Sequence, residues 1–244
     1  TQEQIDFYRR EGYLVLDAIT TQEEIDAMRE VYDRLFEQKA GRDEGNQFDL
    51  AGTDEEGQEQ SLPKIIMPSK YAPELNNTLY HANATAIAKQ LLGEEAEFQG
   101  EHAIRKPGTQ GAATPWHQDE AYWEEDLEYN ALSIWMPLQD TSVEMGCMQF
   151  IPGSHKLDVQ PHHSINNDPR VHGLEIDEVD TSKAVACPLP AGGCTIHGSR
   201  TFHYTSANQT GKTRRAYIKI FGVSPRKRED TRDFYWMKEK KTNR

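Results

Sequence analysis

Two residue types that bind metal ions stand close together near the middle of the chain, in the run Trp-His-Gln-Asp-Glu at residues 116–120. In a strand, residues two apart point to the same side, so the imidazole of His117 and the carboxylate of Asp119 would meet at one point. One histidine and one carboxylate are two of the three ligands of the facial triad that holds non-haem Fe(II). That triad leaves coordination positions open, where a cosubstrate and O2 can bind together. Because the His-x-Asp pair is common in proteins, the prediction needs a third ligand.

The third ligand should be a distant histidine on a neighbouring strand. His197 and His203 compete for this role in the run Cys-Thr-Ile-His-Gly-Ser-Arg-Thr-Phe-His-Tyr-Thr at residues 194–205. His102 could also face the interior of a β-barrel. The remaining histidines are more typical of surface or hydrogen-bonded core positions: His81, His155, His162, His163 and His172. The residues alone leave the choice between His197 and His203 open.

An arginine further along the chain could bind a carboxylate. Residues 211–221 alternate as a strand does, which puts Arg214, Ala216, Ile218 and Ile220 on one face. Arg214 therefore lies on the more apolar face, where a guanidinium without a partner is costly. The planar end of a dicarboxylate would pair with it through two hydrogen bonds. A surface or salt-bridged arginine is the alternative.

The order of these features resembles the phytanoyl-CoA dioxygenase family, a branch of the 2-oxoglutarate oxygenases. The resemblance rests on Pro-Trp-His-Gln-Asp at residues 115–119, on Gly-Cys-Met-Gln-Phe-Ile-Pro-Gly-Ser-His-Lys at residues 146–156, and on the interval from His203 to Arg214. Residues 7–16 also resemble the usual opening of family members. The resemblance covers about residues 4–223, and the motifs are specific when they occur together in this order.

The resemblance implies a metal centre and a cosubstrate site. Well-known members place the second histidine ligand eleven residues before an arginine that binds 2-oxoglutarate, and here 214 − 203 = 11 whereas 214 − 197 = 17. The implied Fe(II) ligands are therefore His117, Asp119 and His203, and Arg214 is implied to hold the far carboxylate of 2-oxoglutarate. His197 matches a histidine that is often present upstream in the family and is not a ligand.

Three further residues take roles from the same resemblance. A hydroxyl residue two positions after the second histidine touches the same carboxylate in the family, and Thr205 stands there. Trp135 resembles an aromatic residue beside the cosubstrate. His162 matches a Pro-His step that borders the active site in some members, which makes it a candidate substrate residue.

We expect the substrate to be bound by loops around the mouth of the barrel. Tyr122 and Trp123, which directly follow the metal motif, are candidates, together with residues 62–71 and 157–179. The acidic segment 43–59 is predicted from its composition to be a solvated, mobile loop, with a lid over the pocket as the alternative.

The activity implied by the resemblance is hydroxylation of an unactivated C–H bond, with O2 as a substrate and release of succinate and CO2 from 2-oxoglutarate. Related halogenases carry Ala or Gly in place of the carboxylate, so the presence of Asp119 favours hydroxylation and leaves desaturation, ring closure and epimerisation open. Because we see no basic patch for a CoA ester, we expect a small polar metabolite or a natural-product intermediate as substrate. The alternatives are a cupin-type metal dioxygenase that needs no cosubstrate and a non-catalytic ligand-binding barrel.

Helices come first in the chain. The spacing of Thr1 with Gln4, and of Thr21 with Glu24, fits capping boxes and predicts two helices. A short strand is predicted between them at residues 13–16, and a third helix at residues 84–92, ended by Gly93.

Short β-rich pieces separated by Gly, Pro and Asn turns follow from about residue 97, a texture typical of a sandwich or closed barrel. Strands are predicted at residues 97–105, 130–137, 148–151, 183–189, 195–197 and 214–223. The fold is therefore predicted to be mostly β with N-terminal helices, and the resemblance makes the barrel a double-stranded β-helix (jelly-roll or cupin-like). We expect one domain over residues 1–244, with a helical part at about 1–95 and a barrel at about 96–225.

Composition excludes several classes of protein. The net charge of −13 argues against binding to nucleic acid, and no apolar run approaches the roughly 18 residues that a membrane helix needs. The three cysteines, an odd number without a Cys-x-x-Cys motif, indicate reduced thiols and a cytoplasmic protein. The sequence does not predict the oligomeric state.

Overall fold

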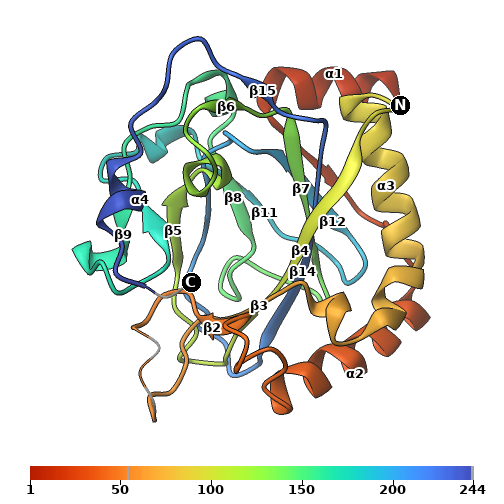
Figure 1. Ribbon diagram of the computed structural model, residues 1–244. Helices are drawn as coiled ribbons and strands as arrows, with labels where there is room; N and C mark the ends of the chain where they lie inside the picture. The colour runs from red at the N-terminus through yellow and green to blue at the C-terminus, as the bar shows by residue number, and fades with distance from the viewer. Residues whose placement is uncertain (54, 56, 243–244) are drawn as a thin grey trace.

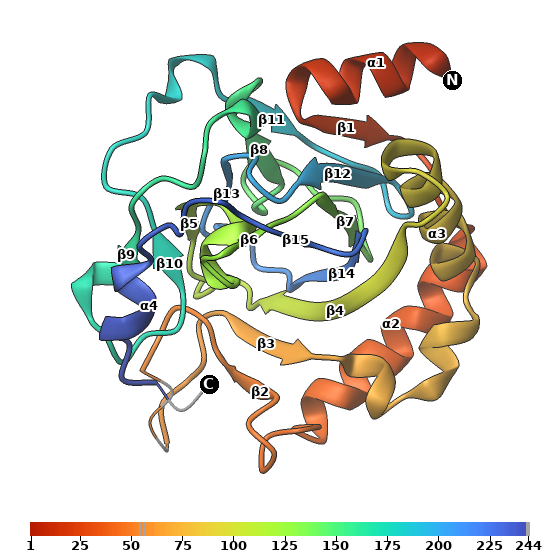
Figure 2. The same cartoon turned by 45° about the horizontal axis from the view of Figure 1, so that its top comes forward.

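Two antiparallel sheets form the centre of the computed structural model, which describes residues 1–53, 55 and 57–242. The larger sheet has the strand order β1-β12-β7-β14-β4-β3-β2, and the smaller has the order β11-β8-β13-β5. The two sheets face each other as the layers of a jelly-roll barrel (Figure 1, Figure 2). The predicted double-stranded β-helix is therefore confirmed.

The strands come from the whole length of the chain. Those of the larger sheet are β1 (Tyr13–Leu16), β2 (Gln47–Asp49), β3 (Pro63–Ile66), β4 (Glu97–Lys106), β7 (Ala131–Pro137), β12 (Cys194–Gly198) and β14 (Arg214–Gly222). Those of the smaller sheet are β5 (Thr114–His117), β8 (Met148–Phe150), β11 (Val185–Cys187) and β13 (His203–Thr205). Two short pairs lie outside them: β6 (Leu127–Glu128) with β15 (Arg226–Lys227), and β9 (His163–Ser164) with β10 (Leu174–Glu175). The predominantly helical first part of the chain thus supplies both edges of the larger sheet.

The first three helices begin where hydroxyl side chains cap them. Thr1 caps α1 (Gln2–Glu11) in a full capping box, and Thr21 caps α2 (Gln22–Glu37). The third helix, α3 (Leu79–Leu92), begins five residues before the predicted start, because the Thr78 hydroxyl accepts the N–H of His81. Helices α2 and α3 cover the outer face of the larger sheet, and α4 (Tyr235–Glu239) lies near β9 (Figure 1).

The alternation predicted for residues 214–221 is confirmed by the two cores. Tyr217 and Phe221 point outward into the cluster between the larger sheet and the helices. Ala216 and Ile218 point inward into the cluster between the two sheets, where Phe150 of β8 also lies. Arg214 follows the inward alternation, so its side chain enters the barrel.

The prediction of a mobile loop at residues 43–59 is wrong for the first part of that segment. Strand β2 lies inside it and is buried, because Phe48 and Leu50 pack on Leu62. The carboxylate of Asp49 accepts the backbone N–H groups of Ser61 and Leu62. These hydrogen bonds connect the end of β2 to the residues just before β3. Asp54 and Glu56 lie outside the described residues.

The last part of the chain packs against the residues that follow the metal motif. Arg232 pairs with the buried Glu120 at 2.7 Å, and the indole N–H of Trp236 donates to the Ala121 carbonyl oxygen at 2.9 Å. None of the helices in the described part of the chain is long and apolar enough to cross a membrane.

Candidate metal and cosubstrate site

The His-x-Asp motif lies at the end of a strand rather than inside one. His117 is the last residue of β5, while Asp119 is the first residue of the 3-10 turn η3 (Asp119–Tyr122), so the prediction that both residues lie in a strand is wrong for Asp119. Gln118 between them keeps extended angles (φ −119, ψ 134), which preserves the two-residue alternation. The two side chains therefore point the same way.

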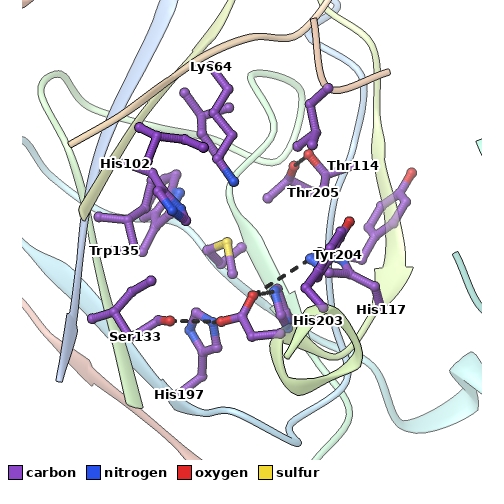
Figure 3. A pocket seen from close by; sticks show the side chains of 18 of the residues that line it. Lys64, His102, Thr114, His117, Ser133, Trp135, His197, His203, Tyr204 and Thr205 are labelled. Atoms are coloured by element: carbon purple, nitrogen blue, oxygen red, sulfur yellow. Dashed lines mark hydrogen bonds and ion pairs between the residues drawn. The ribbon is translucent and has the colours of Figure 1, made fainter. Parts of the chain in front are cut away.

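The third residue of the site is the cross-strand partner of the first. His203 opens β13 and is paired directly with His117 of β5, so the two imidazoles lie side by side with ring centroids 4.1 Å apart. Asp119 Oδ1 lies 3.9 Å from His117 Nε2 and 3.5 Å from His203 Nε2. Figure 3 shows the imidazoles of His117 and His203 side by side. One ligand atom from each of the three residues lies within 4.8 Å of the others, which is the spacing of a metal site.

Backbone carbonyls fix the tautomer of both histidines. His117 Nδ1 donates to the carbonyl oxygen of Pro115 at 2.8 Å, and His203 Nδ1 donates to that of Thr201 at 2.9 Å. Since a carbonyl oxygen only accepts, each Nδ1 carries the proton and each Nε2 presents a lone pair to the common point. Hydrogen bonds of this kind to the ring nitrogen that does not bind the metal orient histidine ligands, so the donor set fits Fe(II).

The charges of the site also suit a divalent cation. Burial and the neighbouring His203 hold the pKa of His117 well below its ordinary value, so the ring is neutral. Burial by itself would raise the pKa of Asp119, but His203 and His197 outweigh it and hold that pKa well below its ordinary value. A neutral imidazole and an ionised carboxylate are the forms that bind a metal.

His197, the competing histidine, has a different partner. It lies on β12, and its Nε2 is 3.3 Å from Asp119 Oδ2, the oxygen that does not face the other two histidines. The Ser133 hydroxyl donates to the same oxygen at 2.7 Å. Three ligand atoms therefore converge from His117, Asp119 and His203, while His197 approaches Asp119 from behind.

Arg214 is a buried cation without an acidic partner among the described residues. It is 1% exposed, and its Nη atoms donate to the backbone carbonyl oxygens of Gly146 at 3.1 Å and Ile104 at 3.4 Å. Its Nε is buried without a hydrogen-bond partner, and burial lowers the pKa of the guanidinium to about 10. Arg214 lines the same cavity of about 250 Å³ as the metal triad. A buried cation that still lacks a hydrogen-bond partner fits the free carboxylate of 2-oxoglutarate.

Two residues predicted from the resemblance line the same cavity as Arg214. Trp135 lines the cavity, and the guanidinium carbon of Arg214 lies 5.4 Å from the centroid of its ring. Thr205 also lines the cavity, and its hydroxyl donates to Thr114 Oγ1 at 3.0 Å. The buried Lys106 ammonium holds the carbonyl oxygen of Thr205 at 3.1 Å, which fixes this end of β13.

Tyr122 and Trp123, both candidates from the sequence, also line the cavity. The hydroxyl of Tyr122 accepts the N–H of Leu174 at 2.7 Å, so this end of the ring is fixed. Residues 62–71 contribute Lys64, and the loop at residues 157–179 contributes His172.

His162 does not stand among the described residues that line this cavity. Its ring is buried behind the metal motif, where Nε2 accepts the N–H of Gln118 at 3.1 Å and Nδ1 donates to the Gln160 carbonyl oxygen at 2.7 Å. The ring also lies 5.4 Å from that of Trp236. His162 thus supports the backbone between the two motif residues, and the expected substrate contact is not found.

Three further cavity residues had no specific role predicted from the sequence. Ser133 stands two positions before Trp135 on β7, so strand alternation could have identified it. His102 was noticed as a residue that could face the barrel and does line the cavity from β4. Lys64 carries no motif, and its ammonium points into the cavity (Figure 3) without a partner in the described part of the chain; burial lowers its pKa to about 8.

Comparison with known proteins agrees with this geometry. A model of the phytanoyl-CoA dioxygenase family (PhyH) matches residues 8–216. The crystal structure of EvdO2 from Micromonospora carbonacea var. aurantiaca complexed with 2-oxoglutarate is 38% identical, has a TM-score of 0.84, and is matched over 97% of this chain and 96% of that one.

Two more distant proteins extend the comparison. Phytanoyl-CoA dioxygenase domain-containing protein 1 of Danio rerio is 25% identical over 260 residues, which are 89% of this chain and 88% of that protein. The non-heme alpha-ketoglutarate-dependent carbocyclase SnoK from nogalamycin biosynthesis shares the fold, with a TM-score of 0.73 at 24% identity over 93% of this chain and 86% of that one.

Proposed function

Because this chain belongs to the phytanoyl-CoA dioxygenase family, we propose that it holds Fe(II) on His117, Asp119 and His203 and hydroxylates a small polar metabolite or natural-product intermediate. The enzyme is an Fe(II)- and 2-oxoglutarate-dependent oxygenase. One observation carries the assignment of residues: two imidazole Nε2 lone pairs and one carboxylate oxygen converge in a cavity whose wall also carries a buried arginine without an acidic partner among the described residues.

The bound Fe(II) and 2-oxoglutarate supply the oxidising chemistry, with O2 as the oxidant and succinate and CO2 as the products of the cosubstrate. Arg214 binds the far carboxylate of 2-oxoglutarate, and Thr205 adds its hydroxyl. Trp135, Ile218 and Met148 give this part of the cavity an apolar wall, which excludes water from the reacting groups. The chain itself therefore positions the reactants rather than reacting with them.

The charges of the cavity narrow the class of substrate. Lys64 and Arg214 are the lysine and arginine side chains among its described lining residues, and Asp119, which serves the metal, is the acidic one. A cationic substrate would meet Lys64 without a compensating carboxylate, so we propose a neutral or anionic substrate. It would lie between Lys64 and the pair Tyr122 and Trp123.

Buried thiols support a place for the enzyme in a reducing compartment. Cys147, Cys187 and Cys194 are all free and buried, and we propose a cytoplasmic enzyme on this ground.

Succinate production tests the proposal. The purified protein is incubated with Fe(II), 2-oxoglutarate and O2 and with a panel of scaffolds in neutral, carboxylate and amine forms. We expect succinate that depends on iron, rises with a neutral or anionic substrate, and is absent from Asp119→Ala. A wild-type protein that oxidises a substrate without forming succinate would contradict the proposal and favour a cosubstrate-independent dioxygenase.

A further inference from the structure

We infer that Ser133 and His197 are positioning residues that together hold Asp119 Oδ2 away from the metal, so that Asp119 binds through Oδ1 alone. We call these two contacts to Asp119 Oδ2 the clamp. The inference rests on the proposed function, because the clamp matters only if Fe(II) and 2-oxoglutarate share the site. Ser133 and His197 belong to the larger sheet. They face the metal motif, which lies at the end of β5 in the smaller sheet.

The two residues are neighbours across a pair of strands. Ser133 on β7 is the register partner of His197 on β12, so their side chains leave the sheet at the same level and on the same face. The hydroxyl of Ser133 is 2.7 Å from Asp119 Oδ2, and Nε2 of His197 is 3.3 Å from it. Figure 3 shows Ser133 and His197 on one side of this contact and His203 on the other.

Both polar side chains are buried, and each has one polar atom in contact with Asp119. Ser133 is 3% exposed and His197 is 2% exposed. In the described part of the chain, Ser133 Oγ bonds to Asp119 alone, and His197 Nδ1 is buried with no hydrogen-bond partner. Burying a hydroxyl and an imidazole in an otherwise apolar wall is costly, and the contact with an ionised carboxylate offsets that cost.

The contact also sets how the carboxylate can turn. Oδ1 faces His117 and His203, whereas Oδ2 is held by donors on the opposite side. A carboxylate whose second oxygen is engaged in this way cannot rotate to chelate the metal with both oxygens. The clamp therefore keeps one more coordination position free than a chelating carboxylate would, and 2-oxoglutarate and O2 require those positions.

Paired substitutions separate the clamp from simple packing. Ser133→Ala and His197→Phe remove the donors, while Ser133→Thr and His197→Gln keep a hydroxyl and an N–H. Ser164→Ala is the matched control, because Ser164 is a buried serine on β9 away from the cavity. Each protein is titrated without oxygen, first with Fe(II) and then with 2-oxoglutarate, and the visible spectrum of the Co(II) form reports the coordination number.

We expect Ser133→Ala and His197→Phe to weaken Fe(II) binding by about ten- to a hundred-fold, as loss of an outer-shell partner does. Their Co(II) spectra should move toward higher coordination number before 2-oxoglutarate is added, and their affinity for 2-oxoglutarate should fall. Ser133→Thr, His197→Gln and Ser164→Ala should stay near the wild type.

Two results would overturn the clamp. One is wild-type Co(II) spectra and 2-oxoglutarate affinity in both Ser133→Ala and His197→Phe. The other is a loss in Ser133→Thr and His197→Gln as large as in the variants without donors, which would mean that side-chain volume alone matters. If the wild type binds neither Fe(II) nor 2-oxoglutarate, the proposed function itself fails, and that outcome is visible before any variant is compared.

Discussion

Replacement of Arg214 by methionine should leave the cosubstrate-free protein about as stable as the wild type and remove its response to 2-oxoglutarate. The side chain is buried, its Nε has no partner, and no acid pairs with it in the described part of the chain. Methionine is apolar, has a similar length and fills irregular space well. The variant therefore removes a charge that only the bound cosubstrate neutralises.

In Arg214→Met, the cost of burying the cation and the hydrogen bonds of the guanidinium are both lost, and these two free energies are of similar size. Burial lowers the pKa of Arg214 to about 10, so keeping the cation buried costs about 3 kcal/mol. Methionine abolishes this cost but also the bonds to the Gly146 and Ile104 carbonyl oxygens, each worth about 1.5–3 kcal/mol, with the longer Ile104 bond toward the low end. The net change in the free energy of unfolding should stay within about 2 kcal/mol.

The loss of cosubstrate binding should be larger. Truncating one partner of a buried charge pair costs about 2–5 kcal/mol, which is roughly a thirty- to several-thousand-fold rise in Kd. At 100 times its Kd, 2-oxoglutarate stabilises the wild type by about 2.7 kcal/mol, which at this chain length raises Tm by roughly 5–11 °C. At the same concentration the variant should keep about a third of that rise or less.

The assay is thermal unfolding with Mn(II) as a metal that does not turn over, with and without 2-oxoglutarate. Arg215→Met is the matched control, because Arg215 is the next residue, points to the other face of β14 and pairs with Asp33 at 2.6 Å. Arg215→Met should lower the Tm of the protein, and 2-oxoglutarate should still raise that Tm by the same amount as in the wild type. A full rise in Arg214→Met would refute the assignment of Arg214 as the carboxylate site.

Three further predictions follow from the surroundings of the metal. Asp119→Ala should bind Fe(II) more weakly in an anaerobic titration and form no hydroxylated product; product at the wild-type rate would remove Asp119 from the reaction. Arg232→Met should lower the free energy of unfolding in urea by about 3 kcal/mol, the low end for a broken buried ion pair, because the buried Glu120 keeps only the Ser199 hydroxyl at 2.8 Å and Arg200 at 3.9 Å among the described residues; an unchanged midpoint would show that the pair does not stabilise the fold. The pKa of His162 falls to about 4 on burial from 6.5, so the unfolded chain binds the extra proton, and stability present above pH 6.5 should be lost toward pH 4 by about 3 kcal/mol. His162→Gln should flatten that part of the stability profile, and an equally steep profile in the variant would contradict the reasoning.

The three candidate metal ligands named from the sequence lie together, whereas the local structure around them differs from the prediction. His117 and Asp119 converge because Gln118 is extended, although the strand ends at His117. The choice of His203 over His197 came from spacing in a known family, and the structure adds a reason: His203 pairs with His117 across β13 and β5. Strand pairing is a long-range property, and no local pattern in the sequence reveals it.

Other features depend on contacts between distant segments. The acidic composition of residues 43–59 concealed β2, whose burial depends on Leu62. The packing of Trp236 and Arg232 on the metal motif joins residues more than a hundred positions apart, and neither belongs to a recognisable motif. His162 was placed near the site correctly, but its orientation toward the backbone of Gln118 could not be read from a Pro-His step.

The most direct test of the central claim is the visible spectrum of the protein with Fe(II) and 2-oxoglutarate in the absence of oxygen. If His117, Asp119 and His203 hold the iron and Arg214 holds the cosubstrate, chelation by the 2-oxo acid should give a weak metal-to-ligand charge-transfer band. The band should be missing from Arg214→Ala at the same limited concentration of 2-oxoglutarate. Iron binding by the wild type without any such band would contradict the account.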